Sequence, residues 1–170
     1  HKKMRFTIGL SQYSLRALLK DGSLDALDFP KFTVDQFGIN AIDLWEGGLP
    51  KDKLDDPKYL AMMRKKADQA GTDLFLLMSG ALDASPKKRE ASTAKISASF
   101  DRAVQLGAPM VRVFLKAPGT DPVAGLQASV EALKPLADEA AKKNLTIAIE
   151  PGASSLSQKG AFLAEVATEL

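Results

Sequence analysis

The sequence predicts an α/β protein of the (βα)8 TIM-barrel type, and a repeated segment plan is the main reason. Four times along the chain, a polar helix end is followed by Gly or Asn and then by a short apolar run. These Gly or Asn residues are Gly38, Gly71, Gly107 and Asn144. Each suits the left-handed residue that ends a helix. Their spacing matches one strand plus one helix, which favours a parallel sheet with right-handed crossovers.

Five strands are expected in chain order. The first has no helix before it, and each of the others follows one of the four helix-ending Gly or Asn residues. The expected strand ranges are 5–11, 41–46, 73–79, 110–116 and 145–150. Helices fill the intervals, and one more follows the last strand. Three helix starts are predicted at Asp56-Pro57, Ser85-Pro86 and Asp121-Pro122, because each pair places a capping oxygen before a Pro suited to the first helical position.

The alternation within the strands favours a barrel over an open, doubly wound sheet. In the fourth strand, Val111, Val113 and Leu115 lie on one face, whereas Arg112 and Lys116 lie on the other. A doubly wound sheet carries apolar residues on both faces. An aliphatic face under helices and a mixed interior face fit a barrel, in which reactive groups sit at the carboxyl ends of the strands.

The length predicts only part of such a barrel. The chain has 170 residues, whereas a complete (βα)8 barrel typically needs about 250. No linker or shift in composition divides residues 1–170, so we expect a single domain. It would be the first five units of a barrel truncated after the fifth. The missing strands would then belong to a longer polypeptide or to another chain.

The composition excludes several classes of function for this sequence. Cysteine is absent and His1 is the only histidine, which excludes disulfides, a thiol nucleophile and a Ser-His-Asp triad. A net charge of +2 and 6% aromatic residues argue against nucleic acid as a partner. The sequence contains no run of about 18 apolar residues, the length that a membrane-spanning helix needs. We expect a soluble protein, with the cytoplasm favoured over an exported form.

Glu150 is the foremost candidate for chemistry. It ends the fifth strand on the mixed face, and Pro151 and Gly152 then turn the chain away. A carboxylate at this position can bind a hard divalent cation or exchange a proton. The alternative is a structural carboxylate paired with Arg112 on the neighbouring strand.

The other candidates also lie where strands end. Asp43, Trp45 and Glu46 end the second strand, and an aromatic face beside carboxylates suits a sugar. The alternative is a core Trp45 beside a solvated Glu46. Arg112 and Lys116 suit an anionic or polyhydroxy ligand, or else a buried ion pair. The remaining strand-end candidates are Gln12, Tyr13 and Ser79.

Four stretches, 9–15, 37–48, 111–116 and 147–152, carry a resemblance to a known family. They resemble the sugar phosphate isomerase/epimerase family, the xylose isomerase-like barrels that also include the endonuclease IV type. The resemblance covers essentially the whole chain and corresponds to the first five βα units of the family.

The resemblance implies a divalent metal ion, Mn²⁺, Mg²⁺, Co²⁺ or Zn²⁺, at the mouth of the barrel. Glu150 matches the ligand from strand five, while the other ligands would lie beyond Leu170. The matching Glu in sugar epimerases also transfers a proton next to a carbonyl, and Glu46 matches a position that often faces substrate. Pro151-Gly152 replaces an Asn-His pair found in many members, which removes a local ligand or hydrogen-bonding group.

The prediction is therefore a metal-dependent isomerase or epimerase of a sugar or related hydroxy-carbonyl compound. Glu150 would be catalytic and a metal ligand, and the substrate contacts would be Tyr13, Trp45, Glu46, Arg112 and Lys116. The alternatives are a keto-sugar lyase of the same barrel type and a non-catalytic carbohydrate-binding or scaffold barrel. A DNA-repair nuclease is disfavoured by the single histidine and the low net charge. A small sugar-like molecule and a second copy of the chain are the expected partners.

Overall fold

The computed structural model describes residues 6–170, so His1 and the predicted first-strand start at Arg5 lie outside the described residues. All five predicted strands are present, although the first is shorter than the predicted range 5–11, because residues 6–8 are not in a strand. They are β1 (Gly9–Ser11), β2 (Ala41–Trp45), β3 (Asp73–Asp83), β4 (Met110–Lys116) and β5 (Thr146–Glu150). Hydrogen bonds link them in the order β1-β2-β3-β4-β5, and the pairs β1–β2 and β4–β5 are parallel. This sequential order lacks the reversal of a doubly wound sheet, so the predicted barrel-type fold is confirmed.

Helices alternate with the strands. The α-helices are α1 (Arg16–Asp21), α2 (Phe29–Phe37), α3 (Pro57–Ala70), α4 (Arg89–Leu106), α5 (Pro122–Lys142) and α6 (Gly160–Thr168). Three short 3₁₀ helices, η1 (Gln12–Leu15), η2 (Ala26–Asp28) and η3 (Glu46–Gly48), lie in the loops after β1 and β2. Among residues 6–170, no helix combines the length and apolarity that crossing a membrane requires.

The four helix-ending Gly or Asn residues adopt the predicted left-handed backbone conformation. Gly38, Gly71 and Gly107 have φ angles of 65°, 67° and 76°, and Asn144 has a φ of 55°. Asn is one of the few residues besides Gly that tolerates this region, because its short side chain can hydrogen-bond locally. The repeat seen in the sequence therefore reflects a repeated way of ending helices before strands.

Two of the three predicted helix starts are confirmed. The carboxylate of Asp56 accepts hydrogen bonds from the backbone N–H groups of α3, and Asp121 caps α5 in the same way. The prediction at Ser85-Pro86 is wrong, since α4 begins at Arg89. The Ser85 hydroxyl donates instead to Oδ1 of Asp83 over 2.6 Å, so it is not used as a helix cap.

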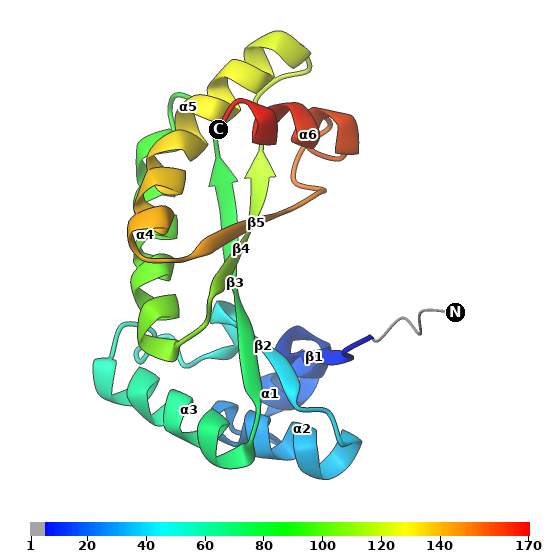
Figure 1. Cartoon of the computed structure of the whole chain (residues 1–170), viewed down its shortest axis with the longest axis vertical. Helices are drawn as coiled ribbons and strands as arrows, with labels where there is room; N and C mark the ends of the chain where they lie inside the picture. Colours follow the sequence, from blue (N-terminus) through cyan, green and yellow to red (C-terminus); the bar gives the residue numbers. More distant parts are fainter. Residues whose placement is uncertain (1–5) are drawn as a thin grey trace. The chain divides into compact units, whose positions relative to one another are not determined.

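The described chain divides into two compact units. The first contains the residues up to Leu77 together with Gln105–Ala108, and the second contains Met78–Val104 and Pro109–Leu170. In the first unit, α2 and α3 pack against each other next to β2 (Figure 1). Its core includes Phe29, Ile42, Leu44, Leu60 and Met63, all of which are fully buried.

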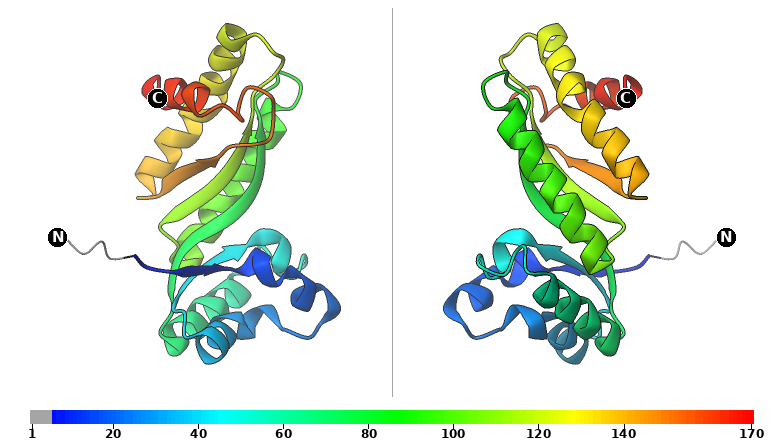
Figure 2. Two further views of the ribbon diagram at one scale, coloured as in Figure 1. Left: turned by 90° about the vertical axis from the view of Figure 1, so that its right-hand side faces the viewer. Right: turned by 90° about the vertical axis from the view of Figure 1, so that its left-hand side faces the viewer.

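In the second unit, α4 and α5 lie on one face of the strands (Figure 2). Val111, Val113 and Leu115 of β4 have no exposed surface, and Leu133 and Leu136 of α5 are also buried. The predicted aliphatic face of β4 is thus confirmed. The alternating residues Arg112, Phe114 and Lys116 lie on the other face, where the candidate site lies.

Candidate functional site

Glu150 forms an ion pair with Arg112 in the second unit. In the register of the two strands, Ala148 is the partner of Arg112 and Glu150 the partner of Phe114. Arg112 and Glu150 are therefore diagonal neighbours on one face of the sheet. Arg112 Nε lies 3.0 Å from Glu150 Oε2. The pairing weighed for Glu150 from the sequence is present.

Arg112 is held from several sides. It is buried, and its Nη1 donates to the backbone carbonyl of Ser79 over 2.8 Å. The guanidinium carbon lies 4.4 Å from the centre of the Phe114 ring, a cation–π arrangement. The Ser79 hydroxyl lies 2.7 Å from that of Ser99 on α4, so β3 is anchored at this point. Because the planar guanidinium is fixed in this way, its N–H groups point in a fixed direction and orient the carboxylate that they pair with.

Glu150 itself is much less enclosed than its partner. Its side chain is 46% exposed, whereas that of Arg112 is 10% exposed. A carboxylate that is oriented by an arginine and still open on one side can accept a proton or contact a cation. The geometry is therefore compatible with both the structural and the chemical interpretation of Glu150.

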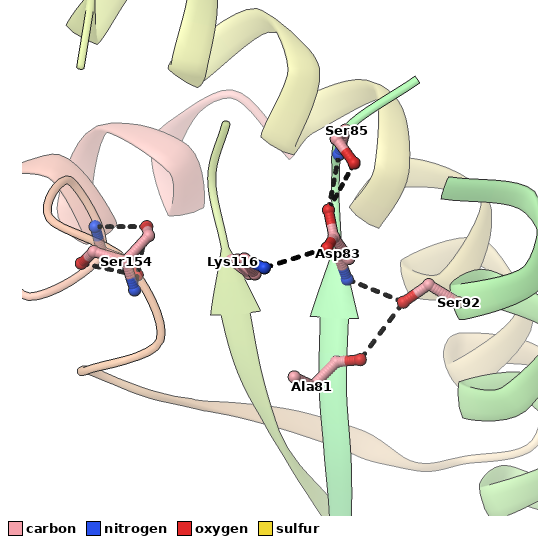
Figure 3. A network of polar contacts seen from close by, with 7 residues as sticks. Ala81, Asp83, Ser85, Ser92, Lys116 and Ser154 are labelled. Carbon is pink, nitrogen blue, oxygen red and sulfur yellow. Dashed lines mark hydrogen bonds and ion pairs between the residues drawn. The ribbon is translucent and has the colours of Figure 1, made fainter. Parts of the chain in front are cut away.

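A second ion pair lies where β3 and β4 end. Lys116 Nζ is 3.4 Å from Oδ2 of Asp83, and the Ser85 side chain and backbone N–H both donate to Oδ1 of the same carboxylate (Figure 3). Ser92 on α4 extends this hydrogen-bond network, because its hydroxyl accepts from the Asp83 N–H over 2.7 Å. Lys116 therefore ends in a polar network within the second unit.

Asp83 is a site residue that the sequence prediction missed. The third strand was expected to end at Ser79, but β3 continues through Gly80 to Asp83. The apolar residues Ala81 and Leu82 after the glycine were the available signal. The strand end that carries the side-chain chemistry is therefore Asp83, while Ser79 is a buried strand residue.

The pKa of Asp83 is lowered by its hydrogen bonds. Burial by itself would raise this pKa, but the Ser85 side chain and backbone N–H stabilise the carboxylate, and Lys116 adds its positive charge. The net effect holds the pKa of Asp83 below its usual value. Asp83 is thus a permanent negative charge near neutral pH and holds the Lys116 ammonium by charge pairing.

The first unit contains its own polar cluster at the ends of β1 and β2. Asp43 is buried, and its Oδ1 accepts from the Ser11 hydroxyl at 3.0 Å and from the Gln12 N–H at 3.2 Å. The Gln12 side chain has no exposed surface, and its Oε1 accepts from the backbone N–H of Trp45 over 2.9 Å. These bonds tie the two strand ends together.

Aromatic residues lie beside this cluster. The rings of Tyr13 and Trp45 meet edge to face, with their centres 4.9 Å apart. The guanidinium of Arg16 lies 4.5 Å from the centre of the Tyr13 ring and donates to the Tyr13 carbonyl. Trp45 is half-buried, so it is not a core residue, and Glu46 opens η3 directly after it. Tyr13, Trp45 and Glu46 thus belong to one local surface of the first unit.

A metal ion at Glu150 would need further donors besides this one carboxylate. Hard divalent cations prefer carboxylate oxygens, and half-exposed Glu150 can supply such a ligand. Within residues 6–170, no three His, Cys, Asp or Glu side chains lie close enough together to hold an ion. Glu150 fits as one member of a ligand set, and it is not a complete site by itself.

Comparisons with solved structures show the fold. The probable 3-DHS dehydratase AsbF from Bacillus anthracis matches with a TM-score of 0.76 at 16% identity, over 96% of this chain and 59% of its own length. A xylose isomerase domain protein from Planctomyces limnophilus matches with a TM-score of 0.61 at 16% identity, over 75% of this chain and 50% of its own.

A D-psicose 3-epimerase from Clostridium cellulolyticum H10, solved with D-tagatose, matches with a TM-score of 0.64 at 14% identity, over 84% of this chain and 55% of its own length. The chain therefore spans between half and three-fifths of these structures. No functionally curated protein matches the sequence significantly. Residues 33–169 match the family described as the xylose isomerase-like TIM barrel. Since this match covers most of the chain, the protein belongs to the xylose isomerase-like TIM-barrel family.

Proposed function

We propose that this chain carries part of the site of a metal-dependent isomerase or epimerase, acting on a sugar or a related hydroxy-carbonyl compound. The observation that carries the proposal is Glu150 at the end of β5, open on one side and oriented by buried Arg112 at 3.0 Å. Epimerases among structures of the same fold support this class of reaction. Carboxyl ends of strands are where barrels of this type place their reactive groups.

In the proposed reaction, Glu150 removes a proton from the carbon next to the substrate carbonyl and returns it to a neighbouring position. Arg112 orients the carboxylate, because Ser79 and Phe114 fix the guanidinium in turn. Glu150 would also be one ligand of Mn²⁺, Mg²⁺, Co²⁺ or Zn²⁺. When bound, such an ion supplies Lewis-acid polarisation of the carbonyl.

The substrate contacts are proposed separately for the two units. In the second unit, Arg112 and Lys116 would contact hydroxyl or anionic groups of the substrate. In the first unit, Tyr13 and Trp45 would offer aromatic faces, and Glu46 would accept hydrogen bonds from sugar hydroxyls. A carboxylate beside aromatic rings suits a ligand that has both C–H faces and hydroxyl groups.

A lyase is the second candidate function. The same proton abstraction, followed by loss of a hydroxyl group one carbon further along, would eliminate water. The likeness to a probable 3-DHS dehydratase supports this reading. The two reactions are distinguished by their products, since isomerisation conserves the substrate mass and elimination lowers it by one water.

Exchange of the substrate proton in D₂O tests the proposal. Candidate hydroxy-aldehydes and hydroxy-ketones are incubated with the protein and Mn²⁺, and deuterium incorporation next to the carbonyl is followed by NMR. We expect Glu150→Gln to slow incorporation by about 10²-fold or more, because a positioned base contributes that much. Chelation should also stop the reaction, and added Mn²⁺ should restore it.

Lys142→Gln, at the exposed end of α5, is the matched control and should exchange at the wild-type rate. Circular dichroism checks that each variant is folded. Unchanged incorporation by folded Glu150→Gln would overturn the assignment of Glu150 as the base. A wild-type protein that binds sugar without exchanging its proton would favour the non-catalytic carbohydrate-binding alternative.

A further inference from the structure

The first unit contains a pocket that the proposed proton transfer does not use. It has a volume of about 720 Å³ and lies among α1, the loop that follows it, and the segment from η3 to Pro50. All of its lining residues fall between Arg16 and Pro50, so the pocket belongs to one unit. Its volume is within the range of pockets that hold small molecules.

One wall of the pocket has no room for side chains. It includes the backbone of Gly47 and Gly48 beside the ring of Trp45. A Cβ atom on Gly47 would lie 2.4 Å from the Trp45 ring, and one on Gly48 would lie 2.8 Å from Oε1 of Gln12. The glycines therefore allow the loop to lie flat against the tryptophan and the buried glutamine.

The rest of the lining is apolar at the base. Leu24 and Leu49 are buried there, and Leu19 and Ala17 contribute from α1. Apolar walls with a small number of placed charges are typical of small-molecule sites. The charges of this pocket therefore indicate which ligand it suits.

Two cations and one carboxylate line the pocket. Arg16 and Lys20 lie one turn apart on α1, and Asp25 lies in the loop that follows. The Asp25 carboxylate is engaged, since its Oδ1 accepts from the Leu27 N–H over 2.8 Å. Arg16 is held over the Tyr13 ring, and among residues 6–170 no carboxylate is paired with Lys20. The charge balance thus favours an anion.

We propose that this pocket binds the anionic group of a small molecule, a phosphate or a carboxylate, with Lys20 and Arg16 contacting the charge. The Trp45 ring and the Gly47–Gly48 backbone would contact the uncharged part of the ligand. The inference rests on the proposed function for the identity of the ligand, a hydroxy-carbonyl substrate with an anionic end. Anion binding itself is measurable without turnover.

The single tryptophan provides the test. In a ¹⁵N-labelled protein, the indole N–H of Trp45 gives one resolved NMR signal. It is followed during titration with ribose 5-phosphate, with ribonate and with ribose, all at one ionic strength. We expect a saturable shift with either or both anionic probes, at concentrations at which ribose gives only a smaller shift that does not saturate. Comparing the two anions decides between phosphate and carboxylate.

Lys20→Met should weaken binding of the anionic probe roughly fivefold, the loss expected for one exposed charge contact. Lys20→Arg should keep most of the affinity. Lys58→Met, an exposed lysine on α3 outside the pocket, is the matched control and should bind as the wild type does. An equal response to ribose, the absence of any saturable shift, or full affinity in Lys20→Met would overturn the proposal.

Glu150→Gln separates this proposal from the proposed function. That variant should lose proton exchange but keep the Trp45 response to the anion. If Lys20→Met binds the anionic probe with full affinity while the wild-type protein exchanges the substrate proton, the anion pocket is rejected and the proposed reaction stands. If the wild-type protein binds the anion through Lys20 but exchanges no substrate proton, the proposed reaction is rejected and the anion pocket stands.

Discussion

At the scale of single residues, Tyr59 combines a buried hydroxyl, unpartnered within the described chain, with a raised pKa. Its hydroxyl on α3 is buried without a hydrogen-bond partner among residues 6–170. Burial raises the pKa of Tyr59 to about 12, and the carboxylates of Asp25 and Asp52 add to the shift. A buried polar group without a partner costs free energy, because it gives up its bonds to water.

Tyr59→Phe should therefore be neutral or raise the free energy of unfolding by up to about 1 kcal/mol. The change removes the unpaired hydroxyl and keeps the ring. Urea unfolding at neutral pH, followed by circular dichroism, measures the difference. Tyr13→Phe, which alters the other and more exposed tyrosine, serves as the comparison. A clear loss of stability in Tyr59→Phe would mean that the hydroxyl has a partner in solution.

The same residue also predicts a dependence on pH. The folded protein holds the Tyr59 proton more tightly than the unfolded chain does, since the pKa is about 12 rather than 10.0. This contribution is complete below pH 10 and is lost as the pH rises towards 12. Between those values, wild-type stability should fall more steeply than that of Tyr59→Phe.

At the scale of elements, the turn from β2 into η3 depends on a glycine. The Trp45 ring occupies the space that a side chain at position 47 would need, with ring carbons 2.4 and 2.5 Å from an added Cβ. The ring cannot keep this place if residue 47 has a side chain. The close contact between the Trp45 ring and position 47 therefore requires a glycine where β2 passes into η3.

Gly47→Ala should lower the free energy of unfolding by about 1–3 kcal/mol, the usual cost of overpacking. It should also move the fluorescence maximum of Trp45, the single tryptophan. Gly80→Ala is the matched control, because nothing lies within 4 Å of an added Cβ there and Gly80 does not have a positive φ. Equal stabilities of the two variants would contradict the contact between Gly47 and Trp45.

At the scale of the whole molecule, the strands differ in how well they are covered. Among residues 6–170, β5 hydrogen-bonds to β4 on one side and has no strand on the other. No residue of β5 is buried, whereas Val111, Val113 and Leu115 of β4 are fully buried. An edge strand with little burial opens more easily than a central strand.

Amide hydrogen exchange should therefore be at least about tenfold faster in β5 than in β4. NMR or mass spectrometry at two protein concentrations measures it. Protection of β5 that rises with concentration would indicate that a second copy covers the edge, in agreement with the predicted homo-oligomer. Equal protection of β4 and β5 at low concentration would contradict an open edge.

Much of the fold could be predicted because its signals are local. The left-handed helix ends at Gly38, Gly71, Gly107 and Asn144 require residue types that few other positions tolerate. The strands follow at once as apolar runs, and their parallel arrangement follows from the alternation of strand and helix. The starts of α3 and α5 could also be predicted, because Asp56 and Asp121 stand directly before a proline.

The end of β3 was placed wrongly because a distant part of the chain decides it. β3 continues past Gly80 because its end is supported from elsewhere: the Ala84 N–H donates to the Lys116 carbonyl, and the Asp83 N–H donates to Ser92. Ser85 does not cap α4, because Asp83 takes its hydroxyl. Lys116 and Ser92 lie outside the segment 79–89, so no pattern within that segment shows what supports the end of β3, whereas the Ser85–Asp83 bond is local to it.

By itself, the sequence determined the class of the fold, the order of its strands and the candidate residues at the strand ends. Backbone conformation and hydrophobic periodicity depend on residues that are close in the sequence, so both can be predicted from the sequence alone. Only the tertiary structure decided that Arg112 pairs with Glu150, that Lys116 pairs with Asp83, and that Trp45 lies against Gly47. Charges and rings interact over a few ångströms in space, and that distance is set by strand register and packing rather than by position along the chain.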